Sequence, residues 1–296
     1  MKLPCNGLVL SQKLERSFSI NGKAKSTLSN YQRCLAHLGL YYMCSPEQLN
    51  EESINDYLYY CQNLHKTPSE SFFKHTIFGL RAAYRVMGME AKRIALPQIK
   101  RQKDLPTVLS KEEVKRLIDA PKYLKHKLII AMLYGCGLRS YELCNLKIED
   151  VDFDRKTVFI CKQKGNYDRY VPLSEHLSRG IKTYLETESP SVYLFNSQVS
   201  KNGDPLGITT RGVQWIIKEN RSKIGTKKKL TAHTLRHTYA THLLEAGLNL
   251  VSLKELLGHA RIETTLVYLH VANTGTSAKF SPLDTLYENQ PQSKGS

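Results

Sequence analysis

Apolar residues recur at every third or fourth position through most of the first hundred residues, which is the period of an amphipathic helix. The stretch 27–42 shows this period most clearly. Its apolar stripe consists of Leu28, Tyr31, Leu35, Leu38 and Tyr42. Comparable stripes predict helices over 54–64 and 72–87, and Ser45 before Pro46 has the capping pattern that opens another. The first part of the chain is therefore predicted to be a small helical bundle.

A polar and basic segment bracketed by Pro97 and Pro106 interrupts this periodicity. Paired prolines around charged residues are typical of an interdomain linker. We therefore predict a helical domain over 1–96, a linker over 97–106 and a second domain from residue 107 onward.

The second domain begins with helical patterns and then changes its period. Ser110 and Glu113 form a capping box, and an apolar helix over 124–134 follows. The period then becomes two, which predicts antiparallel strands before helices return. The strands are expected over 151–153, 157–161 and 169–173, and the helices over 174–186 and from 209 onward. The predicted fold class is mainly α with a small antiparallel β-sheet.

The charge of the chain points to an anionic partner. Its 296 residues include 43 Lys and Arg against 27 Asp and Glu, for a net charge of +16. Residues 1–106 carry +7 (15 basic, 8 acidic) and residues 107–296 carry +9 (28 basic, 19 acidic). A surplus on both parts fits a duplex held between two domains, whereas a generally basic protein would show the same totals. The linker residues Lys100, Arg101 and Lys103 either contact phosphates or stay solvated.

Other features exclude several classes of protein. With 41% hydrophobic and 24% charged residues, the composition is that of a globular chain. No apolar run approaches the roughly 20 residues that cross a bilayer, and the N-terminus lacks the apolar region of a signal peptide. The seven cysteines are odd in number and form no C-x-x-C pair, which argues against a disulfide framework or zinc ribbon and fits a cytoplasmic protein.

Half of the ten histidines lie between His233 and His270. His233 and His237 have the i, i+4 spacing of zinc ligands, but the metalloprotease pattern needs Glu at the second position, where this chain has Thr234. We therefore predict no metal site. His233 and Arg236 instead form an H-x-x-R pair, one helical turn apart, in which the guanidinium suits a phosphate.

Further motifs strengthen this interpretation. Gly137 to Leu143 reads G-L-R-S-Y-E-L, Val171 to Leu173 reads V-P-L, and an L-G-H motif ends at His259, nine residues before Tyr268. In this order the motifs resemble those of the tyrosine recombinases, the phage integrase and Xer-like site-specific recombinases. The resemblance covers the catalytic half of the chain, and for the first hundred residues it is only architectural.

The resemblance implies a set of active-site residues. They are Arg139, Lys164, His233, Arg236, His259 and the nucleophile Tyr268. The hairpin that usually reads G-K-G reads Gln163-Lys164-Gly165 here, which leaves Lys162 as a competitor for the lysine's role. Glu142 is expected to orient one of the cations, and His233 is the expected acceptor of the phenolic proton.

The implied fold is a helical core-binding (SAM-like) domain followed by a mixed α/β catalytic domain over 107–279. The implied reaction joins Tyr268 to a DNA 3′-phosphate and needs no cofactor. Arginines take the place of a metal at the phosphate, and no ATP is needed because the phosphoester energy is retained. The implied partners are double-stranded DNA and further copies of the chain. A homo-tetramer is expected on DNA, with a monomer or weak oligomer without it. Residues 280–296 either dock on a neighbouring protomer or pack on their own domain.

Rival functions remain open at this point. A topoisomerase would relax DNA by the same chemistry as a monomer, and an architectural DNA-binding protein would not need Tyr268. A metal nuclease would need an acidic cluster, which this sequence lacks. An RNA-binding function would explain the positive charge of the chain but not the motifs. Integration, inversion and chromosome resolution are equally compatible with the motifs.

Overall fold

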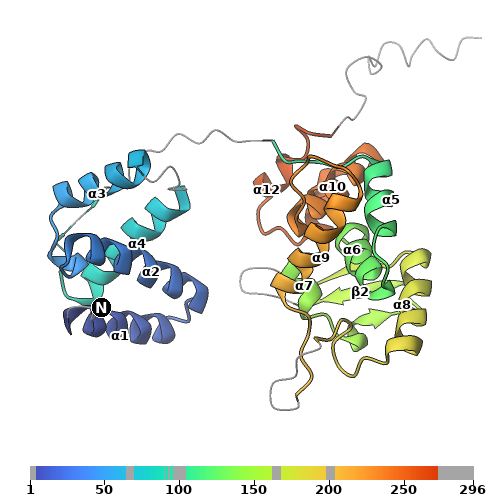
Figure 1. Cartoon of the computed structure of the whole chain (residues 1–296), viewed down its shortest axis with the longest axis horizontal. Coiled ribbons are helices and arrows are strands. Elements are labelled where there is room, and N and C mark those ends of the chain that lie inside the picture. The colour runs from blue at the N-terminus through green and yellow to red at the C-terminus, as the bar shows by residue number, and fades with distance from the viewer. Residues whose placement is uncertain are drawn as a thin grey trace, which may run out of the picture. The chain divides into compact units, whose positions relative to one another are not determined.

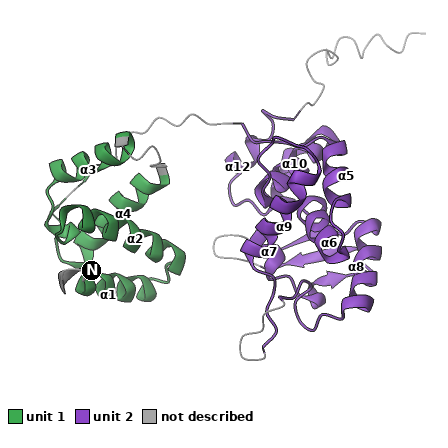
Figure 2. Ribbon diagram, in the orientation of Figure 1, with its two compact units in different colours: residues 1–103 green, residues 104–296 purple. Residues whose placement is uncertain are grey.

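The computed structural model describes residues 5–64, 70–89, 91–92, 94–95, 105–161, 168–197 and 204–272. The chain divides into two compact units, residues 1–103 and 104–296, which are coloured separately in Figure 2. The predicted fold class is confirmed, since the chain is mostly helical and unit 2 contains a small three-stranded antiparallel sheet (Figure 1).

Unit 1 is a bundle of helices. They are α1 (Cys5–Ile20), α2 (Lys25–Tyr42), α3 (Glu51–Leu64) and α4 (Glu70–Val86). Helices α1, α2 and α4 pack against one another, and the apolar stripe of each faces a shared core. Fully buried side chains of this core include Leu14, Leu38, Ile54, Ile77 and Leu80. The three- and four-residue period of apolar positions in these helices therefore arises because each helix buries one face in the core.

Two details of unit 1 differ from the prediction. Helix α1 was not predicted, although Leu10, Leu14 and Phe18 form a buried stripe along it. An α-helix does not open at Ser45. The Ser45 hydroxyl donates to the Glu47 carboxylate at 2.6 Å instead of capping the backbone, and only a 3₁₀ turn, η1 (Pro46–Gln48), follows.

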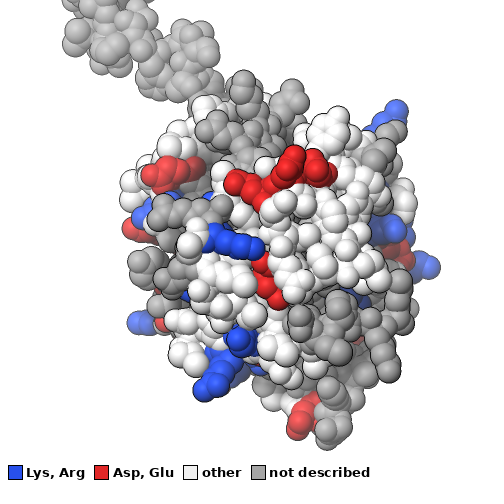
Figure 3. All heavy atoms as spheres, turned by 90° about the vertical axis from the view of Figure 1, so that its left-hand side faces the viewer, with Lys and Arg blue, Asp and Glu red and all other residues white. Residues whose placement is uncertain are grey.

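The surface of unit 1 is not uniformly basic. Figure 3 views the chain from the side of unit 1, and on the described surface that faces the viewer Asp and Glu side chains lie among Lys and Arg around a broad uncharged area. The positive charge of this part of the sequence is therefore not gathered into one patch on that face.

Unit 2 is built around a buried helix. Its elements are α5 (Lys111–Asp119), α6 (Leu124–Gly135), α7 (Ser140–Cys144), the turn η2 (Ile148–Asp150), β1 (Val151–Asp152), β2 (Thr157–Ile160), β3 (Arg169–Pro172), α8 (Glu175–Glu188), α9 (Thr210–Lys223), α10 (Ala232–Glu245), α11 (Leu250–Leu257) and α12 (Glu263–Leu266). Helix α6 contacts α5, α7, α8, α9 and α10, and its residues 128–133 are all buried. Residues 128–133 are enclosed on every side and therefore show no polar face, whereas Lys125, His126 and Lys127 occupy the partly buried first turn of α6.

The sheet has the order β1-β2-β3 with antiparallel pairing. Val158 pairs with Val171, and both are buried, so the period of two follows from one face lying on the core. The predicted capping box at Ser110 is also present, with the Ser110 hydroxyl accepting from the Glu113 N–H at 3.2 Å. Among the described helices, none has both the length and the apolar character needed to cross a membrane.

Candidate active site

Helix α10 carries a buried arginine that joins two loops. The Arg236 side chain is enclosed, with the residue 2% exposed, and donates to the backbone carbonyls of Gly137, at 2.7 Å, and Leu257. It also donates to Nε2 of His259 at 3.1 Å. The G-L-R loop and the L-G-H turn, which lie far apart in the sequence, therefore meet at one guanidinium.

A buried carboxylate holds a group of arginines together. Glu142 accepts from Arg139 at 2.8 Å and from both Nη atoms of Arg169 at 3.0 and 2.8 Å, and it lies 3.8 Å from Arg236. Burial by itself raises the pKa of Glu142, but hydrogen bonds and charge from Arg169 and then Arg139 hold that pKa at about 2. The carboxylate is therefore ionised at neutral pH and contacts more cations than the one expected.

Arg169 is a site residue that the sequence analysis did not single out. Its Nε donates to the Leu256 carbonyl at 2.8 Å, so β3 is tied to the end of α11. Gly258 leaves room for this side chain, because a Cβ there would lie 3.0 Å from Arg169 Nη1. Gly258 also has φ +61°, which a glycine adopts without strain. The alternation of β3 held the signal, since Arg169 falls on the same face as buried Val171.

His259 is neutral and has both ring nitrogens engaged. Because the Arg236 guanidinium can only donate, Nε2 of His259 is the acceptor. The ring proton is therefore on Nδ1, which donates a hydrogen bond to the Thr265 hydroxyl at 2.9 Å. Burial, followed by the positive charges of Arg236, Arg139 and Arg169, lowers the pKa of His259 to about 3. The imidazole is therefore held in one orientation and one tautomer.

Tyr268 lies in the turn after α12 with its ring inside the protein. It is 2% exposed and packs in a cluster with Leu253 and Leu257 of α11. The ring stacks on that of His259, with centroids 6.4 Å apart and planes at 14°. Its hydroxyl forms a 3.0 Å hydrogen bond with Nδ1 of His237. Burial raises the pKa of Tyr268, and Arg236 and Arg139 oppose part of that rise.

His233 lies one turn before His237 on α10 and is exposed. The two imidazoles stack with centroids 6.3 Å apart. Loss of some hydration, and then the positive charges of Arg236 and Arg139, lower the pKa of His233. The structure thus places His233 near the arginines, and the phenol's hydrogen-bond partner is His237 instead.

The structure brings together one group of the predicted residues. These are Arg139, Glu142, His233, Arg236, His259 and Tyr268. The predicted positions Lys162, Lys164, Lys100, Arg101 and Lys103 and the tail 280–296 lie outside the described residues. Within the described part of the chain, no three His, Cys, Asp or Glu side chains gather as metal ligands.

Comparison with known proteins identifies the family of this chain. The model of the phage integrase family matches residues 107–274. The chain belongs to this family. It is 35% identical over 254 residues to the tyrosine recombinase XerA of Pyrococcus horikoshii, covering 85% of both chains. It is 42% identical over 197 residues to XerA of Thermococcus kodakarensis, covering 65% of this chain and 68% of that one. The predicted class of enzyme, a tyrosine recombinase, is confirmed.

Solved structures agree with this assignment. A crystal structure of a XerA recombinase matches with a TM-score of 0.52 and 26% identity, covering 97% of this chain and 100% of that one. XerH bound to a palindromic difH substrate shares the fold, with a TM-score of 0.69 and 21% identity over 92% of this chain and 83% of that chain.

The charge network makes a prediction about stability. A Glu142→Gln variant leaves buried guanidinium groups without their anion, and we expect it to lower the free energy of unfolding at pH 7 by about 3 kcal/mol. The pKa of about 2 lies below the ordinary value of 4.5, so the ionised carboxylate contributes its full stabilisation to the fold at any pH well above 4.5. This contribution is lost as the pH falls from about 5 toward 2.

Urea unfolding at several pH values measures both effects. The difference between wild type and Glu142→Gln should shrink as the pH falls through this window. Glu175, whose side chain is 60% exposed in its pair with Lys156, is the matched control, and Glu175→Gln should change little. A difference that stays constant down to pH 2 would contradict the assigned pKa.

Proposed function

We propose that the protein is a site-specific recombinase that cleaves and rejoins duplex DNA through a 3′-phosphotyrosyl intermediate, without metal or ATP. The observation that carries the proposal is the convergence of Arg139, Arg236 and His259 around Tyr268. These side chains come from separate segments, and Glu142 and Thr265 fix their orientations. A phenol surrounded by fixed cations and imidazoles suits attack on a phosphodiester.

The arginines answer the main electrostatic need of this reaction. Attack on phosphorus builds negative charge on the non-bridging oxygens, and preorganised donors aimed at that charge stabilise the transition state. The side chain of Arg139 is 24% exposed, so it can reach a bound phosphate while keeping its contact with Glu142. Arg236 supplies a second positive charge from a buried position, and its hydrogen bond to Nε2 of His259 helps to hold both side chains in place.

The bonds made and broken balance without an external energy source. The Tyr268 oxygen bonds to phosphorus as the bond from phosphorus to the 5′-oxygen breaks. Lys164 protonates the departing oxygen as general acid, with Lys162 as the alternative. Because the phosphoester is retained in the covalent intermediate, a free 5′-hydroxyl can reverse the step on another strand.

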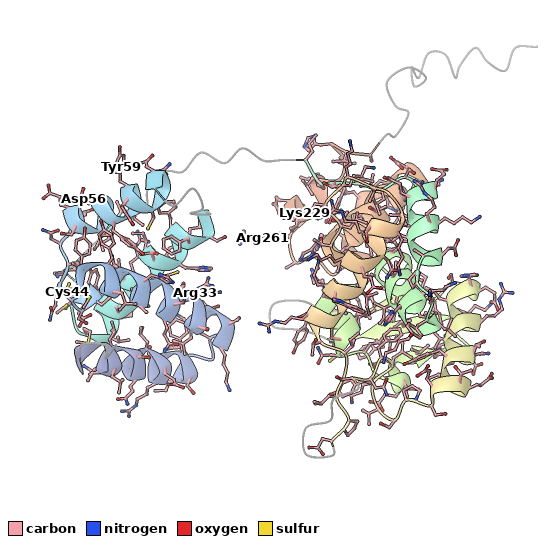
Figure 4. All side chains as sticks on the ribbon, viewed as in Figure 1. Arg33, Cys44, Asp56, Tyr59, Lys229 and Arg261 are labelled. Carbon is pink, nitrogen blue, oxygen red and sulfur yellow. The ribbon has the colours of Figure 1, made fainter. Side chains whose placement is uncertain are left out.

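Exposed cations next to the site support a DNA-binding face. Lys229 precedes α10 and Arg261 follows His259, both are exposed, and they lie on the same side of unit 2 (Figure 4). In unit 1, exposed Arg33 of α2 lies on the side opposite Cys44. The solved XerH structure is a complex with its difH substrate, and that relationship to DNA is proposed here for this chain.

The proposal extends to the organisation of the chain on DNA. Residues 1–96 form the core-binding domain, 97–106 the linker and 107–279 the catalytic domain, so that a duplex is held by both. Two DNA sites are joined in a homo-tetramer, and the tail 280–296 couples neighbouring protomers. The basic surplus on both parts of the sequence supports this arrangement.

A nicked suicide duplex tests the chemistry. The duplex carries the site that the protein selects from a random-sequence library, and its nick lets the cleaved fragment diffuse away. In EDTA the wild type should accumulate a covalent protein–DNA adduct that migrates slowly in a denaturing gel. Adduct formation that requires added Mg²⁺, or no adduct on any selected site, would contradict the proposed function.

The exposed arginine gives a graded prediction. Arg139→Ala should slow single-turnover cleavage by about 10²–10³, because one transition-state contact to the phosphate is lost. Arg179→Ala on α8 is the matched control, since that arginine is exposed and lies outside the site. Equal rates for the two variants would show that Arg139 does not contact the reacting phosphate.

A further inference from the structure

The hydroxyl of Tyr268 forms its hydrogen bond with His237 of α10. We propose that His237 is a catalytic residue of the reaction, whose Nδ1 receives the phenolic proton when the Tyr268 oxygen attacks phosphorus. The role rests on the proposed function. It moves the part expected of His233 to the histidine one helical turn further along α10.

Geometry favours His237 over its neighbour. Its Nδ1 lies 3.0 Å from the phenolic oxygen, which is hydrogen-bond distance, and its ring centroid lies 5.5 Å from that of Tyr268. His233 stacks against His237, with the ring centroids 6.3 Å apart. The phenol therefore meets His237 directly, whereas His233 remains beside Arg139 and Arg236, where the phosphate is proposed to bind.

The remaining imidazole of the site cannot serve as the base. Both nitrogens of His259 are engaged, one by Thr265 and the other by Arg236. Its pKa of about 3 makes it a weak acceptor for a phenolic proton. Although its ring stacks on Tyr268, it has no free lone pair that faces the hydroxyl.

The charge state of His237 suits proton acceptance. Burial, and then the positive charges of His233 and Arg236, lower its pKa, so the imidazole is neutral at neutral pH, and its tautomer with the proton on Nε2 presents a lone pair at Nδ1 to the phenol. Burial raises the pKa of the Tyr268 phenol, so spontaneous ionisation is disfavoured and an acceptor in contact is needed.

The proton balance closes around a full cycle. As the bond from Tyr268 to phosphorus forms, the phenolic proton moves to His237 Nδ1, while the departing 5′-oxygen takes a proton from the hairpin lysine. In rejoining, the attacking 5′-hydroxyl returns its proton to the lysine, and His237 returns its proton to the Tyr268 oxygen. No proton or cofactor is consumed overall.

Two substitutions separate hydrogen bonding from proton acceptance. His237→Leu removes both, whereas the amide of His237→Asn can still bond to the phenol at the Nδ1 position but cannot take its proton. On the nicked suicide duplex, each should slow single-turnover cleavage by about 10²–10⁴. Thermal unfolding and duplex binding, measured alongside, should stay close to those of the wild type.

Rescue by a more acidic phenol distinguishes a base from a structural residue. Incorporation of 3,5-difluorotyrosine at position 268 lowers the need for an acceptor, so His237→Leu should recover at least about tenfold relative to the ordinary phenol. Arg139→Ala, which lacks a phosphate contact instead, should recover far less and is the matched control.

Each outcome decides the assignment. Wild-type rates in both His237 variants, or a loss that the fluorinated tyrosine does not rescue, would overturn the role of His237. Rescue in a His233→Asn variant but not in His237→Leu would assign the proton to His233. A wild type that forms no adduct fails at an earlier stage, because it overturns the proposed function itself.

Discussion

A Tyr268→Phe variant should form no covalent adduct with the suicide duplex and should still bind it as the wild type does. The ring is 2% exposed and packs among apolar side chains of α10 and α11, so phenylalanine preserves its packing. Only the nucleophilic oxygen and its hydrogen bond to His237 are lost, which costs about 1 kcal/mol of stability. Denaturing gels measure the adduct, and mobility shifts in native gels measure the binding.

Tyr184→Phe supplies the control for this result. Tyr184 of α8 is also fully buried, and its hydroxyl has no hydrogen-bond partner in the described part of the chain. This variant should form the adduct at the wild-type rate. An adduct from Tyr268→Phe would show that another residue attacks the phosphate.

A Lys164→Ala variant should cleave an ordinary phosphodiester about 10²–10⁴ more slowly, because the departing 5′-oxygen loses its proton donor. A duplex with a bridging 5′-phosphorothiolate has a leaving group that needs no proton. Cleavage of that substrate by Lys164→Ala should approach the wild-type rate. The comparison measures a chemical role that a loss of folding cannot imitate.

Lys162→Ala is the matched variant, two residues away in the same hairpin sequence. It should cleave both substrates at similar rates if Lys164 is the acid. If the phosphorothiolate duplex instead restores cleavage by Lys162→Ala and not by Lys164→Ala, the general acid is Lys162.

Patterns of burial made most of the fold predictable. Helix α2 follows the stripe of Leu28, Leu35 and Leu38, and the strands follow an alternation whose inward positions include Val158 and Val171. The failure at Ser45 has a local cause, because its hydroxyl bonds to Glu47 rather than to the backbone. Propensity indicates where a cap can form and does not show which competing hydrogen bond prevails.

The site was only partly accessible from sequence, since its contacts join distant segments. The pairing of Arg169 with Glu142 and with the carbonyl of Leu256 depends on β3 packing beside α11, which no spacing reveals. For His237, the sequence shows only that it stands four residues after His233, the spacing of a pair of zinc ligands. Its role at the phenol emerges once the turn after α12 brings Tyr268 against α10.

The most direct test of the account is to locate the protein–DNA bond itself. After reaction with the suicide duplex in EDTA, proteolysis and mass spectrometry should find the DNA attached through its 3′-phosphate to the peptide that contains Tyr268. The released strand should carry a free 5′-hydroxyl. Attachment at another residue, or through a 5′-phosphate, would contradict the proposed mechanism.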